Sequence, residues 1–374
     1  MKKKILISVG TRPEVIKIAP LYHELKKINE FDIFFCLTGQ HSTLANNLIK
    51  FFQIKVDYNL SVMKKNQSIN ELSSSISRKF SNLLNHLKPS LVIVHGDTTS
   101  AVTSAQCAFF NKIDVAHIES GLRTNSYSSP WPEEANRRII SVVAKYNFCP
   151  THDNVKNLKL LNDSYDQKVF LTGNTIIDSI RYVFRSLDLK FIHNYFLKKL
   201  GIDTNEDNFV LITCHRRENF GNNLSNICKT IKFLANHNKS IKFIFPVHYN
   251  PNIKDTVFLK LKNVDNLYLI KPLQYEYFIY LLSKSLMLIS DSGGIQEEAI
   301  EFTKPLILLR DNTERPEALN AKFIKMCGAN KDDIISTFNF FKLNNFKFKK
   351  IKNPFEKNNA SKTIASILKN NLSG

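Results

Sequence analysis

Three carboxylates occur where a strand-like run gives way to a loop or helix in the first half of the chain. Asp97 follows the apolar run 91–94, Glu119 follows the run 114–118, and Glu133 falls in the first turn of a helix behind a proline-rich loop. Because the carboxyl ends of parallel strands meet at one edge of a sheet, these side chains are expected to converge. Taken singly, Asp97 would be an N-cap and a first-turn glutamate would offset the helix dipole. Together they predict proton transfer on two sides of a substrate.

A histidine takes the same kind of position in the second half. The apolar run 209–213 is followed by Cys214 and then by His215, Arg216, Arg217 and Glu218. A single histidine is more often structural, but one at a strand end beside two arginines and a glutamate is typical of a polar cleft. His215 is therefore a fourth candidate for proton transfer.

A turn with two adjacent glycines indicates an anion site. Leu286–Ile289 predict a buried strand and a helical pattern follows, which leaves Ser290–Gly294 as the turn between them. Glycines let a ligand approach the backbone, and a helix start favours negative charge, so a diphosphate would suit this turn. The alternative is an ordinary turn capped by Ser290 or Asp291.

Three cationic side chains lie in segments that follow predicted strands, as the carboxylates do. Arg12 opens the helix after the first strand, Lys17 lies in the next turns of that helix, and Arg315 follows a late strand. Such residues are suited to a diphosphate, although surface solvation is the alternative for Lys17. Phe278 lies in an aromatic-rich helix and could stack on a base, although core packing is the ordinary role of such a residue.

Strand and helix patterns alternate along the chain, which predicts an α/β fold with parallel sheets. Strands are expected at 4–9, 32–38, 91–94, 114–118, 144–149, 168–171, 209–213, 241–246, 267–270, 286–289 and 305–309. The turn 172–176 marks a domain boundary, and an amphipathic helix, Phe355–Leu372, is expected to cross back to the first domain. We therefore predict an N-terminal domain of residues 1–172 plus 356–374, with the carboxylates, and a C-terminal domain of residues 173–355, with the glycine turn.

Composition excludes several classes of protein. A chain of 374 residues with 43% hydrophobic content suits two globular domains. The formal charge of +19 favours an anionic partner, but lysines are spread along the chain, and a nucleic-acid role would rest on net charge alone. Most of the charge is expected to be a solvated surface. The densest basic segment is 342–357, which is expected to cover a linker or helix flank, with contact to an anionic surface as the alternative. Six cysteines fit neither a metal site nor a disulfide framework, and no run is apolar enough to span a bilayer. We expect a cytoplasmic protein without a nucleic-acid or membrane partner.

Seven motifs stand in a fixed order along the chain. They are Gly10-Thr11-Arg12-Pro13-Glu14 with Lys17, His95-Gly96-Asp97-Thr98-Thr99, His117-Ile118-Glu119-Ser120-Gly121-Leu122-Arg123, Pro132-Glu133-Glu134-Ala135-Asn136-Arg137, His215-Arg216-Arg217-Glu218, Asp291-Ser292-Gly293-Gly294-Ile295-Gln296-Glu297-Glu298 and Thr313-Glu314-Arg315-Pro316-Glu317. This set resembles the non-hydrolysing UDP-N-acetylglucosamine 2-epimerases, and the likeness spans nearly the whole chain.

The resemblance implies two Rossmann-like domains facing each other across a cleft, which is the glycosyltransferase B-type fold. It places Phe278 near the uracil of UDP and Glu298 at the ribose hydroxyls. The residues that it places near the diphosphate are Arg12, Lys17, Ser292 and Arg315. Gly293 and Gly294, in the turn after Ser292, are the other residues expected to bind UDP. Those that match the family's catalytic cleft are Asp97, Glu119, Glu133 and His215. The chain departs from the family at Ser120, where alanine is expected, and at Glu356–Asn359, where a glycine-aspartate-glycine turn is common.

The implied activity is reversible epimerisation of UDP-N-acetylglucosamine to UDP-N-acetylmannosamine, a precursor of cell-surface polysaccharide. No nicotinamide or other cofactor is needed and no metal-ligand pattern occurs, so we expect neither a cofactor nor a metal ion. We expect the protein to form a homodimer. The alternatives are a hydrolysing epimerase that releases N-acetylmannosamine and UDP, a glycosyltransferase on the same fold, and a nucleotide-sugar-binding regulator without turnover. The cluster of acidic residues argues against the regulator, because buried carboxylates near a diphosphate are destabilising unless they act.

Overall fold

The chain divides into two compact units. The computed structural model describes residues 2–39, 43–64, 67–124, 126–127, 130–159 and 166–372. Unit 1 comprises Met1–Ser179 and Pro354–Gly374, and unit 2 comprises Ile180–Asn353. The division falls within helix α7 (Thr175–Ser186), whereas the expected boundary preceded that helix.

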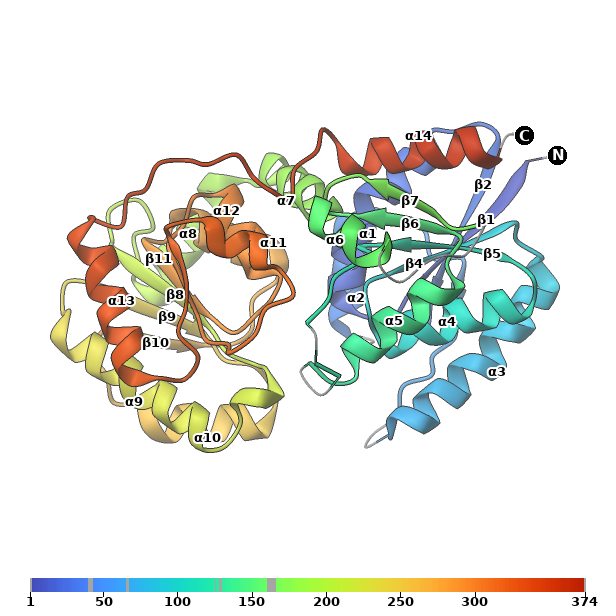
Figure 1. Ribbon diagram of the computed structural model, residues 1–374. Coiled ribbons are helices and arrows are strands. Elements are labelled where there is room, and N and C mark those ends of the chain that lie inside the picture. The colour runs from blue at the N-terminus through green and yellow to red at the C-terminus, as the bar shows by residue number, and fades with distance from the viewer. Residues whose placement is uncertain are drawn as a thin grey trace. The chain divides into compact units, whose positions relative to one another are not determined.

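Unit 1 is built on a seven-stranded parallel sheet in the order β3-β2-β1-β4-β5-β6-β7 (Figure 1). Its central strands are almost wholly buried and apolar, as parallel strands covered on both faces must be. The strands are β1 (Lys3–Val9), β2 (Phe31–Leu37), β3 (Tyr58–Asn59), β4 (Leu91–His95), β5 (Asp114–Ile118), β6 (Tyr146–Cys149) and β7 (Lys168–Leu171). Its helices, besides α7, are α1 (Arg12–Lys26), α2 (Thr43–Phe51), α3 (Ile69–Leu87), α4 (Thr99–Phe110), α5 (Glu133–Val143), α6 (His152–Lys159) and α14 (Ala360–Leu372).

Unit 2 repeats the plan with a six-stranded parallel sheet in the order β10-β9-β8-β11-β12-β13. The strands are β8 (Phe209–Thr213), β9 (Lys242–Pro246), β10 (Leu267–Ile270), β11 (Met287–Ser290), β12 (Leu306–Leu308) and β13 (Ile324–Met326). The helices are α8 (Leu189–Leu200), η1 (Arg217–Asn219), α9 (Asn222–His237), α10 (Pro251–Leu261), α11 (Tyr275–Lys284), α12 (Ile295–Glu301), η2 (Pro316–Asn320) and α13 (Lys331–Leu343). Both sheets reverse their strand order beside the first strand, between β1 and β4 and between β8 and β11, which is the Rossmann arrangement. Ligands bind at such switch points, beyond the carboxyl ends of the strands.

The C-terminal helix returns to unit 1, where α14 packs against α1 (Figure 1). It begins at Ala360, so the expectation of a helix from Phe355 is wrong over its first five residues. Phe355 is fully buried, and its carbonyl accepts a 2.8 Å hydrogen bond from the Asn174 backbone N–H. The Phe355 carbonyl is therefore bonded to a distant residue and not within a helix. The Ser361 N–H and hydroxyl then donate to Asp178 Oδ2 at 2.8 and 2.7 Å and fix the helix start.

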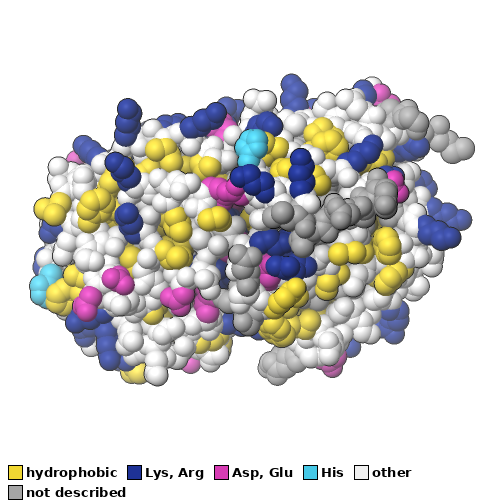
Figure 2. Space-filling view, in the orientation of Figure 1, with side chains coloured by type: hydrophobic (Ala, Val, Ile, Leu, Met, Phe, Trp, Pro, Cys, Tyr) yellow, Lys and Arg dark blue, Asp and Glu magenta, His cyan; other side chains and the backbone are white. Residues whose placement is uncertain are grey.

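Charge is distributed over the surface. On the face that Figure 2 shows, lysine and arginine side chains are scattered among apolar and neutral ones instead of forming one continuous patch. Within the described ranges, no helix is long and apolar enough to cross a membrane.

Candidate functional site

The carboxyl edge of the unit 1 sheet carries two of the four expected acid–base residues. Asp97 follows β4, Glu119 follows β5, and Arg12 opens α1 directly after β1. Since β1 pairs with β4 and β4 with β5, these three residues stand on neighbouring strand ends. The structure therefore brings Asp97, Glu119 and Arg12 to one edge, as the strand pattern predicted.

Glu119 is held by three side chains from elsewhere in unit 1. Lys17 Nζ lies 2.7 Å from both carboxylate oxygens, and both side chains are more than nine-tenths buried. Asn174 Nδ2 donates to Oε1 at 3.3 Å, and His95 Nε2 lies 3.1 Å from Oε2. Glu119 also has a φ of +65°, a region that residues other than glycine rarely occupy and that is often found at functional sites. Lys17 thus pairs with a carboxylate of its own domain, a partner that sequence reasoning missed.

Asp97 does not cap the helix that follows it. The N-cap of α4 is Thr98, whose hydroxyl accepts a 3.0 Å hydrogen bond from the Ala101 N–H. The Asp97 side chain, one-quarter exposed, instead accepts a 2.8 Å hydrogen bond from Arg137 Nε. The structure excludes the N-cap explanation of Asp97 and leaves a partly exposed carboxylate beside a buried arginine.

Helix α5 supplies two adjacent glutamates with different environments. Glu134 is fully buried and pairs with Arg137 Nη1 at 2.9 Å and Arg138 Nε at 3.0 Å. It also accepts a 3.1 Å hydrogen bond from the Thr124 N–H, which ties down the loop after β5. Glu133 is partly buried at the first position of the helix. Glu134 is therefore a structural residue, and Glu133 remains the candidate on this helix.

Another buried carboxylate, Glu14, was not among the candidates. Its Oε2 accepts hydrogen bonds from Gly10 N at 3.1 Å, Thr11 N at 2.7 Å and Thr11 Oγ1 at 2.6 Å. Its Oε1 accepts a 3.0 Å hydrogen bond from Thr98 Oγ1, in the turn that carries Asp97. Burial raises the Glu14 pKa from 4.5 to about 7, against the opposing effect of these hydrogen bonds. Glu14 links the turn before Arg12 to the turn after β4; the Thr-x-x-Glu spacing of a capping box was the available sequence signal.

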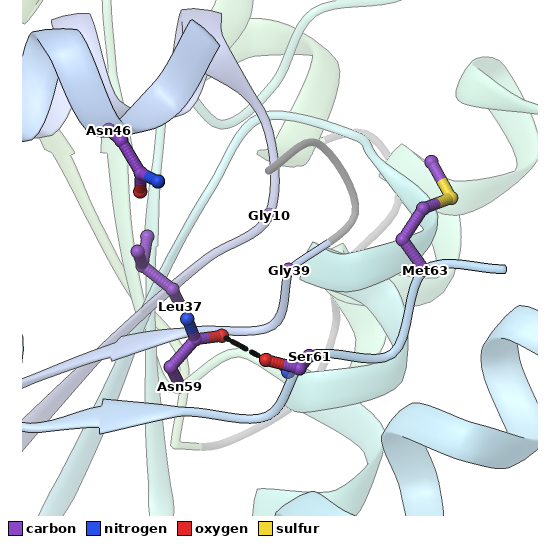
Figure 3. Close-up of a pocket in the computed structure, with 7 residues that line it drawn as sticks. All are labelled: Gly10, Leu37, Gly39, Asn46, Asn59, Ser61 and Met63. Atoms are coloured by element: carbon purple, nitrogen blue, oxygen red, sulfur yellow. Dashed lines mark hydrogen bonds between the residues drawn. The ribbon is translucent and has the colours of Figure 1, made fainter. Parts of the chain in front are cut away.

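A pocket of about 170 Å³ opens beside Gly10 in unit 1 (Figure 3). Two carboxamides contribute to it, from α2 and from the end of β3, and Asn59 Oδ1 accepts a 3.1 Å hydrogen bond from Ser61 Oγ. Its lining residues are Gly10, Leu37, Gly39, Asn46, Asn59, Ser61 and Met63. None of the candidate residues is among the described residues of this lining, although Gly10 lies two positions before Arg12.

In unit 2, the turn after β8 is organised by the carboxylate of Asp291. Asp291 is fully buried at the end of β11, and its Oδ2 accepts hydrogen bonds from the N–H groups of His215 at 2.9 Å and Arg216 at 2.8 Å. Asn219 Nδ2 donates to the same oxygen at 3.1 Å. The N-cap of α12 is Gly294, so the expected alternative of a cap by Ser290 or Asp291 is wrong.

The glycine turn lies against a network of buried charges. Arg315 Nε is 3.1 Å from Glu297 Oε1, and Arg315 Nη1 donates to Glu314, which also accepts a 2.9 Å hydrogen bond from Arg310 Nη1. A methyl group on Gly293 would overlap the Glu314 carboxylate and come within 3.0 Å of Arg315 Nη1. A methyl group on Gly294 would meet open space. Gly293 is thus needed for packing, whereas Gly294 leaves its backbone accessible.

Helices α11 and α12 meet through a hydrogen bond in unit 2. The Tyr275 hydroxyl donates to Glu298 Oε1 at 3.0 Å. Phe278 lies one turn after Tyr275 on α11 and is partly buried. The residues expected at the uracil and at the ribose therefore stand on adjoining helices. Among the described residues, no group of three or more His, Cys, Asp or Glu side chains could hold a metal ion.

Comparisons with known proteins show which family the chain is related to. A profile described as UDP-N-acetylglucosamine 2-epimerase matches residues 23–369. The chain belongs to the UDP-N-acetylglucosamine 2-epimerase family. A UDP-N-acetylglucosamine 2-epimerase of Campylobacter jejuni is 46% identical over 341 residues, covering 90% of this chain and 88% of that protein.

Solved structures of the epimerase family extend the match to the fold. The enzyme of Neisseria meningitidis bound to UDP-N-acetylglucosamine superposes with a TM-score of 0.93 and 41% identity, covering 99% of this chain and 100% of that one. The Methanocaldococcus jannaschii enzyme in complex with UDP-N-acetylglucosamine and UDP gives a TM-score of 0.86 and 31% identity, covering 98% and 99%. The two parallel-sheet domains are those of the glycosyltransferase B-type fold, and the family's enzymes are isomerases.

Proposed function

We propose that this epimerase interconverts UDP-N-acetylglucosamine and UDP-N-acetylmannosamine by eliminating UDP and adding it back. The observation that carries the proposal is the convergence of Asp97 and Glu119 beside Arg12 at one switch point, in a chain of the epimerase family. Proton-transfer groups beside a cation are what an elimination with an anionic leaving group requires.

The chemistry explains why the leaving group must move. The C2 hydrogen of the sugar is not flanked by a carbonyl and is barely acidic, so direct deprotonation is a poor route. Departure of UDP from C1 builds positive charge at the anomeric carbon, which makes the C2 proton removable and leaves an unsaturated glycal. A proton delivered to the opposite face of C2, with UDP restored at C1, completes the inversion.

Each candidate residue has a role in this scheme. Arg12, Arg315 and the turn Ser292–Gly294 stabilise the departing diphosphate, because positive charge and backbone N–H groups favour the leaving anion in the transition state. Phe278 contacts the uracil and Glu298 the ribose hydroxyls, a division supported by their adjoining helices. The groups that move protons on the two sugar faces are Asp97, Glu119, Glu133 and His215.

Lys17 has a changed role in the proposal. Family resemblance places it near the diphosphate, but its ammonium is 2.7 Å from both oxygens of Glu119. We therefore propose that Lys17 acts first on Glu119, by holding that carboxylate in its ionised form and in one orientation.

Solvent exchange tests the reaction. The enzyme is incubated with UDP-N-acetylglucosamine in deuterated water, and the product and recovered substrate are examined by NMR. We expect deuterium at C2 of UDP-N-acetylmannosamine; product that keeps protium at C2 would reject the route. Asp97→Asn and Glu133→Gln are each expected to lower kcat by about 100-fold or more while UDP still binds. Chromatography of the products also separates the alternatives, since a hydrolase releases free sugar and a glycosyltransferase needs an acceptor.

The homodimer is a further part of the proposal. Helices α4 and α5 pack against each other and present exposed apolar side chains, with Phe110 75% and Val142 72% exposed. A second copy of the chain would cover this surface. Light scattering after size exclusion is expected to give twice the chain mass, and Phe110→Ser with Val142→Ser to give monomer. A wild-type monomer at micromolar concentration would contradict the proposed homodimer.

The proposed location is the cytoplasm. All six cysteines are buried free thiols, which supports a cytoplasmic setting, and cell fractionation tests it.

A further inference from the structure

The carboxylate of Asp291 does more than close a turn. It is fully buried at the end of β11, 76 positions from His215 in sequence. Its two oxygens accept the His215 N–H at 3.1 and 2.9 Å, and Oδ2 accepts the Arg216 N–H at 2.8 Å. The Cys214 thiol adds a 3.2 Å contact to Oδ2. The backbone that carries the histidine is therefore fixed to one buried anion.

The same carboxylate reaches the imidazole ring. His215 Nδ1 lies 3.4 Å from Asp291 Oδ1, while 41% of the histidine side chain is exposed. One ring nitrogen thus faces a buried acceptor, and the ring still has access to ligand. A histidine ring whose Nδ1 meets a carboxylate carries its proton on that nitrogen, which leaves Nε2 with a lone pair.

We propose that Asp291 is a positioning residue for His215, and that its carboxylate holds the neutral ring in the Nδ1–H form so that Nε2 exchanges protons with the ligand. This inference rests on the proposed function for the identity of that ligand. The form of the ring is independent of turnover and can be measured separately. The arrangement follows the general use of a buried carboxylate to orient a histidine that handles protons.

Nitrogen NMR of histidine-labelled protein at pH 8 tests the tautomer directly. The ring signals of His215 are assigned by their loss in His215→Gln. We expect Nδ1–H in the wild type and a majority of Nε2–H in Asp291→Asn, because the amide no longer offers the same anionic acceptor. A wild-type ring in the Nε2–H form overturns the inference, and this result needs no folded variant.

A control variant separates the ring contact from the shape of the turn. Asn219→Ala removes another donor to the same carboxylate, since Asn219 Nδ2 is 3.1 Å from Asp291 Oδ2, without touching the imidazole. It is expected to keep the Nδ1–H form. An equal shift of tautomer in Asn219→Ala and Asp291→Asn would show that the turn, and not the ring contact, decides the tautomer, and would overturn the inference.

Kinetics then connect the ring to catalysis. We expect Asp291→Asn to lower kcat by about 10- to 100-fold. KM and UDP affinity should stay within about twofold, and circular dichroism should show a folded protein. If kcat is unchanged in both Asp291→Asn and His215→Gln, the catalytic role of His215 in the proposed function fails, and with it the positioning role of Asp291. If only His215→Gln loses activity, His215 is catalytic and the inference about Asp291 is overturned.

Discussion

Burial of Glu14 should make the stability of unit 1 depend on pH. The side chain is 2% exposed and its pKa is raised from 4.5 to about 7, chiefly by desolvation. A carboxyl group whose pKa is higher in the folded state contributes stability at low pH, and this contribution is lost as pH rises through the folded pKa. The shift corresponds to about 3 kcal/mol in total, of which about 2.5 kcal/mol falls between pH 5 and pH 8.5.

The perturbation is Glu14→Gln, which removes the titration and keeps the shape. The free energy of unfolding is measured in urea at pH 5 and pH 8.5. The fluorescence of Trp131, the chain's single tryptophan, reports on the unit that contains Glu14. Between these pH values, the wild type should lose about 2.5 kcal/mol more than the variant.

A matched control is available in α3. Glu71 is also three residues after its N-cap and accepts hydrogen bonds from the Ser68 N–H and hydroxyl, both at 2.8 Å. It is exposed, and those hydrogen bonds lower its pKa below 4.5. Its contribution is present above that value and is lost only as pH falls further, so Glu71→Gln should leave the interval from pH 5 to pH 8.5 unchanged. If Glu14→Gln and the wild type change in parallel over this interval, the reasoning about desolvation is refuted.

Two further predictions concern the binding groups. Lys17→Met should destabilise unit 1 by about 3–5 kcal/mol, because it leaves Glu119 buried without its cation, and it should lower kcat more than UDP affinity. Thermal unfolding measures the stability and titration calorimetry measures UDP binding. A variant that is as stable as the wild type and only binds UDP more weakly would contradict this prediction. Gly293→Ala should destabilise unit 2, because the new methyl group overlaps Glu314. Gly294→Ala should fold normally and still weaken UDP binding, because its methyl group enters open space that is expected to hold ligand. Equal thermal stability of the two alanine variants would contradict the packing argument.

The strand pattern was predictable because it is local. Parallel strands are short, mainly apolar runs, and those expected at 114–118 and 209–213 match the central strands β5 and β8. The runs expected at 168–171 and 267–270 match the edge strands β7 and β10. The terminal helix was placed too early, since burial of Phe355 and its hydrogen bond to Asn174 depend on a contact distant in sequence.

Partners distant in sequence explain what the site analysis missed. Lys17 and Glu119 are 102 positions apart, and no periodicity relates them. A local cap was the alternative considered for Asp291. Its carboxylate instead accepts hydrogen bonds from the turn after β8, because strands β8 and β11 are neighbours. Sequence order gives the kind of residue at a strand end, whereas the pairings between strand ends come only from the folded sheet.

Unit 1 is completed only after unit 2 has been synthesised, because its last helix, α14, packs against α1. Strand β1 and helix α1 are synthesised before unit 2, yet the helix that packs against α1 is synthesised after it. Unit 2 is continuous from Ile180 to Asn353 and has every strand of its sheet before the last helix emerges. The surface of α1 that α14 contacts is therefore left uncovered in the nascent N-terminal domain until unit 2 has been synthesised.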